Sequence, residues 1–149
     1  MRLPRLIYLV DDDADFQFLV QQVFDLFLPQ YRVRLFGDGA DLVDVLDGVA
    51  TSVDDLPGLI VLDVDMPRLD GFQTLAQLKR HPQWQSVPVV IMTNRTDLDY
   101  QQQSYQLGAS AFVLKPMDLM AIKSLMTLLC EYEGDFSDFL ASYQRSQVT

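Results

Sequence analysis

Five short apolar segments, separated by stretches with helical periodicity, constrain the fold of this chain more than any other feature. The segments cover residues 6–10, 31–36, 59–62, 87–92 and 111–114. The first is continuously apolar, as in a parallel strand covered on both faces, whereas 31–36 alternates apolar and polar residues and predicts a strand with one less covered face. Strands that alternate with helices predict an α/β fold, in which crossovers place helices on both faces of one doubly wound parallel sheet.

The helical stretches are recognised by apolar residues that recur every three or four positions. The first predicted helix ends before Pro29 and buries Phe16, Leu19, Val20, Val23, Phe24 and Phe27. A short helix is predicted over 42–49, followed by a polar loop over 50–57. Further helices are predicted from Gly71 to 78, over the Gln-rich stretch 98–107, and after the capping residue Asp118.

The C-terminal segment is set apart by Gly134, which breaks the last of these helices. The domain is therefore predicted at 1–131 and an extension at 132–149. Phe136, Phe139, Leu140 and Tyr143 fall on one face of a short amphipathic helix. Because an isolated helix of about ten residues is unstable in water, this face is expected to pack on the domain or on another chain.

Composition excludes several classes of protein. The chain has 149 residues and a net charge of −10, which disfavours nucleic acid as a partner. Its single cysteine, Cys130, lies in an apolar helical stretch and is interpreted as a buried structural thiol. No apolar stretch is long enough for a membrane span or a signal peptide, so a cytoplasmic location is expected.

Chemically useful side chains follow four of the five predicted strands. They are Asp11, Asp12 and Asp13 after the first, Asp63 and Asp65 after the third, Thr93 after the fourth, and Lys115 and Pro116 after the fifth. Ligands of open parallel sheets bind at the carboxyl ends of the strands, so these side chains are expected to converge on one pocket if the strands are neighbours.

Carboxylates crowded together raise one another's pKa, and such a cluster persists when a cation neutralises it. An all-oxygen site suits Mg²⁺. One carboxylate can also attack phosphorus and form an aspartyl phosphate, while a lysine and a threonine hydroxyl hold phosphoryl oxygens. The joint placement at successive strand ends therefore indicates phosphoryl transfer, although each residue alone is a weak signal.

On these residues the chain resembles the CheY-like receiver domains of two-component response regulators. The motifs that carry the resemblance are 9–12, 63–71, 88–93 and 108–116, and the similarity covers about residues 5–131. It implies a flavodoxin-like sheet with strand order 2-1-3-4-5. It also implies that Asp63 accepts a phosphoryl group from a histidine kinase or phosphotransfer protein, and that the chain catalyses only its own phosphorylation and dephosphorylation.

The resemblance also assigns roles around Asp63. Mg²⁺, or another divalent cation such as Mn²⁺, would be bound by Asp12, Asp63 and the backbone carbonyl of Asp65, with Asp11 acting mostly through a metal-bound water. Thr93 and Lys115 would hold the phosphoryl oxygens. In the family the peptide bond corresponding to Lys115–Pro116 is cis, so a cis bond is expected here, aiming Lys115 inward.

The implied switch couples Thr93 to Phe112, which would turn inward when the hydroxyl moves to the phosphoryl group; Phe112 as a plain core residue is the alternative. The output face would be roughly 97–129. Asn94 and Asp65 depart from the common pattern and are expected to alter phosphorylation lifetimes. No output domain is expected after residue 131, so the signal would leave through a protein partner, dimerisation or phosphorelay.

The regulators paired with cyanobacterial phytochrome kinases are the most similar subfamily, and their members form homodimers through the fourth-helix to fifth-strand side. Met120 and Leu128 are expected to be exposed there. Two other functions remain open. Asp63 and Asp65 resemble the nucleophile pair of haloacid-dehalogenase-like phosphatases, which would turn over free phosphomonoesters. A receiver-like interaction module would bind partners without accepting phosphate.

Overall fold

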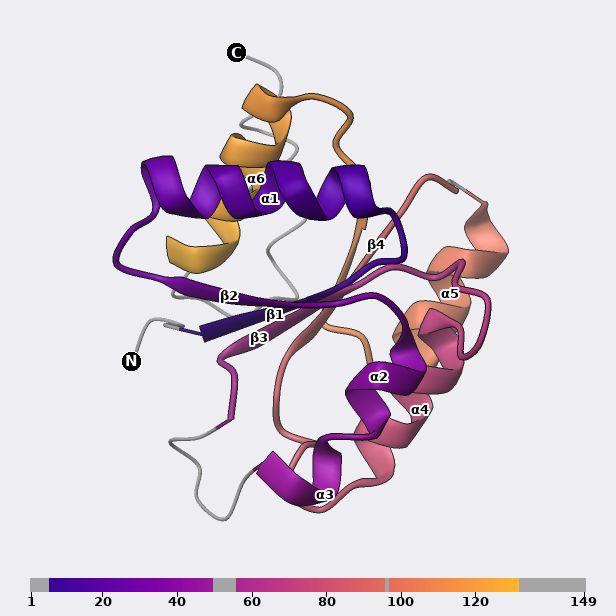
Figure 1. The fold of residues 1–149 in the computed structure, drawn as a ribbon. Coiled ribbons are helices and arrows are strands. Elements are labelled where there is room, and N and C mark those ends of the chain that lie inside the picture. Colours follow the sequence, from indigo (N-terminus) through magenta and orange to yellow (C-terminus); the bar gives the residue numbers. More distant parts are fainter. Residues whose placement is uncertain (1–5, 50–55, 96, 132–149) are drawn as a thin grey trace.

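Five parallel strands form a single sheet in the computed structural model, which describes residues 6–49, 56–95 and 97–131. The strands are β1 (Leu6–Val10), β2 (Arg32–Phe36), β3 (Leu59–Leu62), β4 (Val89–Thr93) and β5 (Ala111–Leu114), in the order β2-β1-β3-β4-β5. Figure 1 shows β1 and β3 side by side at the centre of the sheet, where Ile7 pairs with Leu59. The predicted flavodoxin-like α/β fold and its strand order are confirmed.

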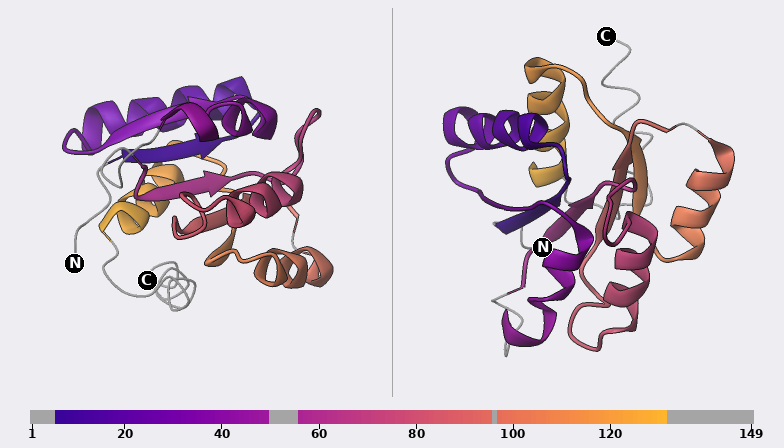
Figure 2. Two further views of the ribbon diagram at one scale, coloured as in Figure 1. Left: turned by 90° about the horizontal axis from the view of Figure 1, so that it is seen from below. Right: turned by 45° about the vertical axis from the view of Figure 1, so that its right-hand side comes forward.

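Helices cover both faces of the sheet and divide the core into two clusters (Figure 1). Helices α1 (Ala14–Phe27) and α6 (Leu119–Glu131) pack together on one face. The other face carries α2 (Gly39–Val43), α3 (Leu46–Val49), α4 (Gly71–Arg80) and α5 (Leu98–Gln106), as the rotated views of Figure 2 also show. Strands β1, β3 and β4 therefore bury both sides, which explains why they read as apolar runs, whereas β2 keeps one face partly exposed.

Several element boundaries differ from the predictions, and three of the differences have clear physical reasons. The helix predicted over 42–49 is divided into two short helices, α2 and α3. Helix α2 begins earlier than predicted, at Gly39, because the Asp38 side chain caps it there. Strand β4 begins at Val89 instead of residue 87, because Pro88 has no N–H to donate to a ladder. It extends to Thr93, whose carbonyl accepts a hydrogen bond from the Lys115 N–H at 2.8 Å.

Two further expectations concern segments at the margins of the domain. Most of the 50–57 loop and the whole extension 132–149 lie outside the described residues. The short helix predicted in the extension therefore stays a prediction. Among the described helices, none has the length and apolar character that crossing a membrane requires. Cys130 is buried on α6 as expected, and burial raises the pKa of its thiol to about 12.

Candidate functional site

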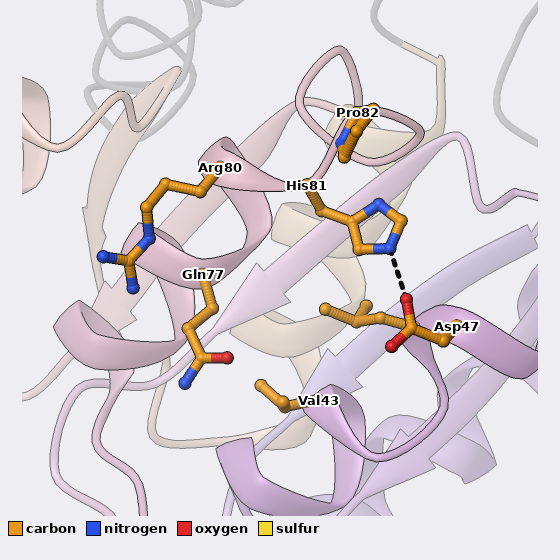
Figure 3. A pocket seen from close by; sticks show the side chains of 7 residues that line it. Val43, Asp47, Gln77, Arg80, His81 and Pro82 are labelled. Atoms are coloured by element: carbon orange, nitrogen blue, oxygen red, sulfur yellow. Dashed lines mark hydrogen bonds and ion pairs between the residues drawn. The ribbon is translucent and has the colours of Figure 1, made fainter.

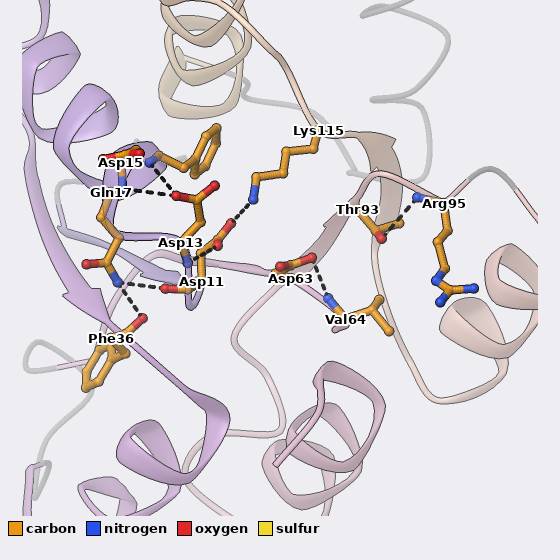
Figure 4. Close-up of polar contacts among 11 residues, drawn as sticks. Asp11, Asp13, Asp15, Gln17, Phe36, Asp63, Val64, Thr93, Arg95 and Lys115 are labelled. Atoms are coloured by element: carbon orange, nitrogen blue, oxygen red, sulfur yellow. Dashed lines mark hydrogen bonds and ion pairs between the residues drawn. The ribbon is translucent and has the colours of Figure 1, made fainter. Parts of the chain in front are cut away.

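The predicted site residues meet at the carboxyl edge of the sheet (Figure 4). Asp11 follows β1, Asp63 follows β3, Thr93 ends β4 and Lys115 follows β5. The Nζ atom of Lys115 lies 2.8 Å from Oδ2 of Asp11, and Asp11, Asp12 and Asp63 each offer an oxygen within 4.8 Å of the other two. The expected convergence is therefore found, because parallel strands place their carboxyl ends on one edge.

Backbone hydrogen bonds continue past the strand ends and fix the acidic residues. The Asp11 N–H donates to the Phe36 carbonyl at 3.0 Å, and the Asp63 N–H donates to the Val10 carbonyl at 2.9 Å. The side chain of Gln17 adds two donations, to the carbonyls of Asp11 (2.7 Å) and Phe36 (3.0 Å). Gln17 was not identified from the sequence, where a glutamine within a helical pattern carries no signal of its contacts.

The turn after β1 separates the neighbouring aspartates. Asp11 is fully buried and its Oδ1 accepts the Asp13 N–H at 2.9 Å, whereas Asp12 is exposed. Asp13 caps α1 by accepting the N–H groups of Asp15 and Phe16. Asp11 thus reaches the site from the buried side and Asp12 from the solvent side, whereas Asp13 is the N-cap of α1.

Burial dominates the electrostatics of the site. It raises the pKa of Asp63 to about 7, with the Asp11 carboxylate adding to the effect and Lys115 opposing it. Burial also raises the pKa of Asp11 from its ordinary value, although the nearby Lys115 ammonium pulls it down. One lysine does not neutralise this buried charge, so the site favours a further cation.

The donor set fits a hard divalent cation. Asp11 Oδ2 is buried, and the contact recorded for it is the 2.8 Å ion pair with Lys115 Nζ. Three carboxylates supply only oxygen ligands, and one of them is reachable from solvent. Oxygen ligands of this kind suit Mg²⁺ or Mn²⁺ and exclude a thiolate-based zinc site.

The peptide bond between Lys115 and Pro116 is trans, so the expectation of a cis bond is wrong for this structure. The trans form is the lower in energy for most X–Pro bonds, by about 0.5–1 kcal/mol. Lys115 nevertheless points inward, because its ammonium lies between the Asp11 carboxylate and the Phe16 ring, 4.5 Å from the ring centroid.

Arg95 lies beside the site, next to Asn94 and Asp65, the two residues that depart from the family pattern. Its Nε donates to Oδ2 of Asp65 at 3.2 Å, and its backbone N–H donates to Oγ1 of Thr93 at 3.2 Å. Asn94 is exposed. The Asp65 side chain therefore forms an ion pair across two loops, a contact that the sequence did not reveal because it depends on the relative position of those loops.

Asp38 supports the loop after β3. It is 2% exposed and accepts the N–H groups of Ala40, Arg68 and Leu69 at 2.9, 3.0 and 2.9 Å. Burial alone would raise the pKa of Asp38, but these three donors lower it below its ordinary value. The residue links α2 to the loop that carries Asp65.

Phe112 is buried in the core cluster beneath α4 and α5, at 7% exposure. The edge formed by α5, β5 and α6 exposes large apolar side chains, namely Leu98, Leu114, Met117 and Met120. Leu128 was expected to be exposed there, but it is half-buried and packs against the other core cluster, so that expectation is wrong. A helix that packs against both the sheet and α1 leaves a narrower exposed face than its sequence suggests.

A shallow pocket of about 340 Å³ lies away from the acidic site, at the C-terminal end of α4 (Figure 3). His81 borders it and makes a 2.9 Å contact between Nε2 and Oδ1 of Asp47. Its Nδ1 accepts the Gln83 N–H at 3.2 Å. Both ring nitrogens thus have local partners, which favours a structural role for His81.

The comparisons with known proteins agree with this geometry. Residues 7–127 match the response regulator receiver domain family. Response regulator Rcp1 of Synechocystis sp. is 29% identical over 117 residues, which are 78% of this chain and 80% of Rcp1. Response regulator Rre1 of the same organism is 30% identical over 141 residues, and the match covers 93% of this chain but only 57% of Rre1.

Solved structures give the same result for the fold. The Mn²⁺-bound form of Rcp1 superposes with a TM-score of 0.75 at 25% identity, covering 88% of this chain and 98% of the other. The phosphorylated cyanobacterial phytochrome response regulator RcpA superposes with a TM-score of 0.75 at 24% identity, covering 87% and 96%. The second likeness shows the fold alone.

Proposed function

The chain belongs to the response regulator receiver domain family, and on that premise we propose that Asp63 accepts a phosphoryl group from a histidine kinase or phosphotransfer protein. The observation that carries the proposal is the meeting of Asp11, Asp12 and Asp63 within 4.8 Å, beside an inward-pointing Lys115. In the transfer, an oxygen of the ionised Asp63 carboxylate forms a bond to phosphorus while the bond between phosphorus and the donor nitrogen breaks.

The proposal assigns a task to each neighbouring residue. Asp12, Asp63 and the backbone carbonyl of Asp65 would hold a Mg²⁺ or Mn²⁺ ion directly, and Asp11 would hold it mostly through water. When bound, the ion supplies positive charge that offsets the charge of the phosphoryl group. The Thr93 hydroxyl donates to one phosphoryl oxygen, and the Lys115 ammonium pairs with another after leaving Asp11.

The output we propose is a conformational change read by a protein partner or by a second copy of the chain. Movement of the Thr93 hydroxyl toward the phosphoryl group would let Phe112 turn inward. Thr93 lies on β4 and Phe112 on β5, and β5 contacts α5, where Leu98, Leu114 and Met117 leave an apolar edge. This edge supports dimerisation through α5, β5 and α6 on activation.

Intact-mass measurement tests the acceptor. After incubation with Mg²⁺ and a small phosphodonor, the wild type should gain the mass of one phosphoryl group, and Asp63→Asn should gain none. Asp47→Asn is the matched control, because this exposed carboxylate lies at the distant pocket and should leave labelling intact.

Each of the other possible results would point to a different acceptor or a different function. Equal labelling of the wild type and Asp63→Asn would refute Asp63 as the acceptor. No labelling of either would favour an interaction module that works without phosphate. Continued release of phosphate from free phosphomonoesters, with no stable label, would favour the phosphatase.

A further inference from the structure

One side chain, Arg95, joins the two loops that flank Asp63. Through its backbone N–H it contacts Oγ1 of Thr93, and through its guanidinium it contacts the carboxylate of Asp65, each at 3.2 Å. Figure 4 shows Thr93 between Asp63 and Arg95, with the Arg95 backbone nitrogen turned toward the Thr93 hydroxyl. Arg95 therefore touches both the hydroxyl and the loop that the proposed function uses.

The contacts of Arg95 also extend to the helices behind the site. Its guanidinium lies 5.1 Å from the centroid of the Tyr100 ring on α5, and that ring meets Phe72 of α4 edge-on at 5.1 Å. A cation held by a carboxylate on one side and an aromatic face on the other has few alternative positions. Arg95 is consequently linked to α5 through Tyr100 and to the loop after β3 through Asp65.

The Thr93 hydroxyl is coupled to this arrangement through its hydrogen bond with Arg95. Its side chain is fully buried, and its oxygen accepts the Arg95 N–H at a distance near the upper limit for such a bond. A rotation or shift that carries the hydroxyl toward Asp63 stretches this contact further, unless the backbone at Arg95 follows. If that backbone follows, the guanidinium is drawn away from Asp65.

We propose that Arg95 is a positioning residue that holds the Thr93 hydroxyl in its resting place, with the Arg95–Asp65 ion pair acting as a latch against occupation of the phosphoryl site. The proposal rests on the proposed function of Asp63 and adds a mode of regulation to that site. A contact present only in the resting state weakens ligand binding by its own free energy. Because both side chains are about half exposed, at 52% and 54%, the expected effect is about two- to fivefold.

A double-mutant cycle measures this latch directly. Binding of beryllofluoride with Mg²⁺ is titrated for the wild type, Asp65→Asn, Arg95→Gln and the double variant. Removing either charge also changes the general attraction of the site for ions, but that part is additive and cancels in the cycle. Arg95→Gln should favour binding about two- to fivefold more in the presence of Asp65 than in the Asp65→Asn background. Additive effects would overturn the latch.

A second ion pair provides the matched control. Arg68 and Asp41 are 2.7 Å apart and similarly exposed, and Arg68 also lies in the loop after β3, but its hydrogen bonds go to Asp38 and Asp41. The cycle with Arg68→Gln and Asp41→Asn should be additive for beryllofluoride binding. Equal coupling in both cycles would mean that the effect is not specific to Arg95, and the latch would be wrong.

Two more outcomes separate the latch from the function on which it depends. Arg95→Lys keeps the charge and the backbone donor, so it should restore most of the coupling that Arg95→Gln removes. A failure of that rescue would count against the ion pair as the cause. If the wild type forms no beryllofluoride complex at all, the proposed function is wrong and the latch with it; if the complex forms without coupling, only the latch is wrong.

Discussion

Single residues at the acidic edge carry more buried negative charge than Lys115 neutralises. Asp63 is 7% exposed with a pKa raised to about 7, and Asp11 is fully buried with a raised pKa despite its ion pair. A carboxyl whose pKa is raised by folding disfavours the folded state once it ionises. The site is thus arranged at some cost to the stability of the metal-free protein.

Removing the charge of Asp63 should therefore stabilise the metal-free protein. In metal-free buffer at pH 8, Asp63→Asn should raise the free energy of unfolding by about 1–3 kcal/mol, because the amide is uncharged and its oxygen can still accept the Val64 N–H. The gain should be mostly lost near pH 4, where Asp63 is protonated in the folded state and only partly ionised in the unfolded state. Urea denaturation at both pH values measures it.

Asp99→Asn, which removes an exposed carboxylate on α5, should change stability by less than about 0.5 kcal/mol. Adding Mg²⁺ should stabilise the wild type and leave Asp63→Asn nearly unchanged. A destabilised Asp63→Asn protein at pH 8 would contradict the electrostatic account.

Asp38 gives the opposite dependence on pH. Three backbone donors lower its pKa, so its stabilising effect is complete above the ordinary carboxyl pKa and is lost as the pH falls through the lowered value. Asp38→Asn should cost about 1–3 kcal/mol at pH 7, because its amide N–H₂ would face a backbone donor. The difference between the two proteins should shrink at pH 2–3, as urea midpoints would show. A constant difference would argue against this assignment.

The sequence predicted the site residues that stand at strand ends and missed those that depend on loops. Asp11, Asp63, Thr93 and Lys115 were predictable together because a parallel sheet aligns its carboxyl ends. Arg95, Asp38 and Gln17 were not predictable, because each acts through a partner whose position is set by a crossover or a loop. The contacts of these three residues lie up to 31 positions apart in the sequence.

Among the elements, α4 contacts the site through its first turn. The Gly71 N–H donates to the Val64 carbonyl at 2.8 Å, and a methyl group on Gly71 would overlap the backbone carbonyl oxygen of Asp63. Asp70 and Gln73 close this turn with a capping box. Helix α4 therefore starts in direct contact with the backbone of the proposed acceptor.

Gly71→Ala should consequently destabilise the protein by about 2 kcal/mol or more, since backbone atoms must move to admit the methyl group. It should also weaken binding of Mg²⁺, because the displaced backbone is that of Asp63 and its neighbour. Gly48→Ala is the control: no atom lies within 4 Å of the added methyl group, so stability should be unchanged or slightly higher. Thermal unfolding and metal titration of both variants test this. Equal behaviour of the two would refute the close contact.

The strands were more predictable than the boundaries between short helices. Burial on both faces produces apolar runs that stand out in a sequence, whereas α2 and α3 are 5 and 4 residues long and too short for a clear period. The Lys115–Pro116 bond was misjudged because it was inferred from the family alone. Its inward lysine is explained by local contacts with Asp11 and Phe16.

At the scale of the whole molecule, the edge formed by α5, β5 and α6 exposes large apolar side chains among the described residues. Leu98, Leu114, Met117 and Met120 are 51–79% exposed along α5, β5 and the start of α6. Strand β5 is also a terminal strand of the sheet, next to β4 only. An association surface at this edge would be coupled to the site through Thr93 and Phe112.

Sedimentation with Mg²⁺ and beryllofluoride tests this association. The wild type should shift from monomer toward dimer when the analogue is added, and Leu114→Glu should prevent the shift while still binding the analogue. Phe18→Glu is the control, because Phe18 is equally prominent at 62% exposure but lies on α1. A monomer under all conditions would remove the dimer from the proposal.

Trp84 provides an intrinsic fluorescence probe of the core. It is the single tryptophan, it is fully enclosed, and its indole N–H donates to the Leu46 carbonyl at 3.0 Å beside the Tyr8 ring. Its emission should be that of an indole shielded from water, and it should shift to longer wavelength only when the core opens. Fluorescence can therefore follow unfolding in every variant above without interference from events at Asp63.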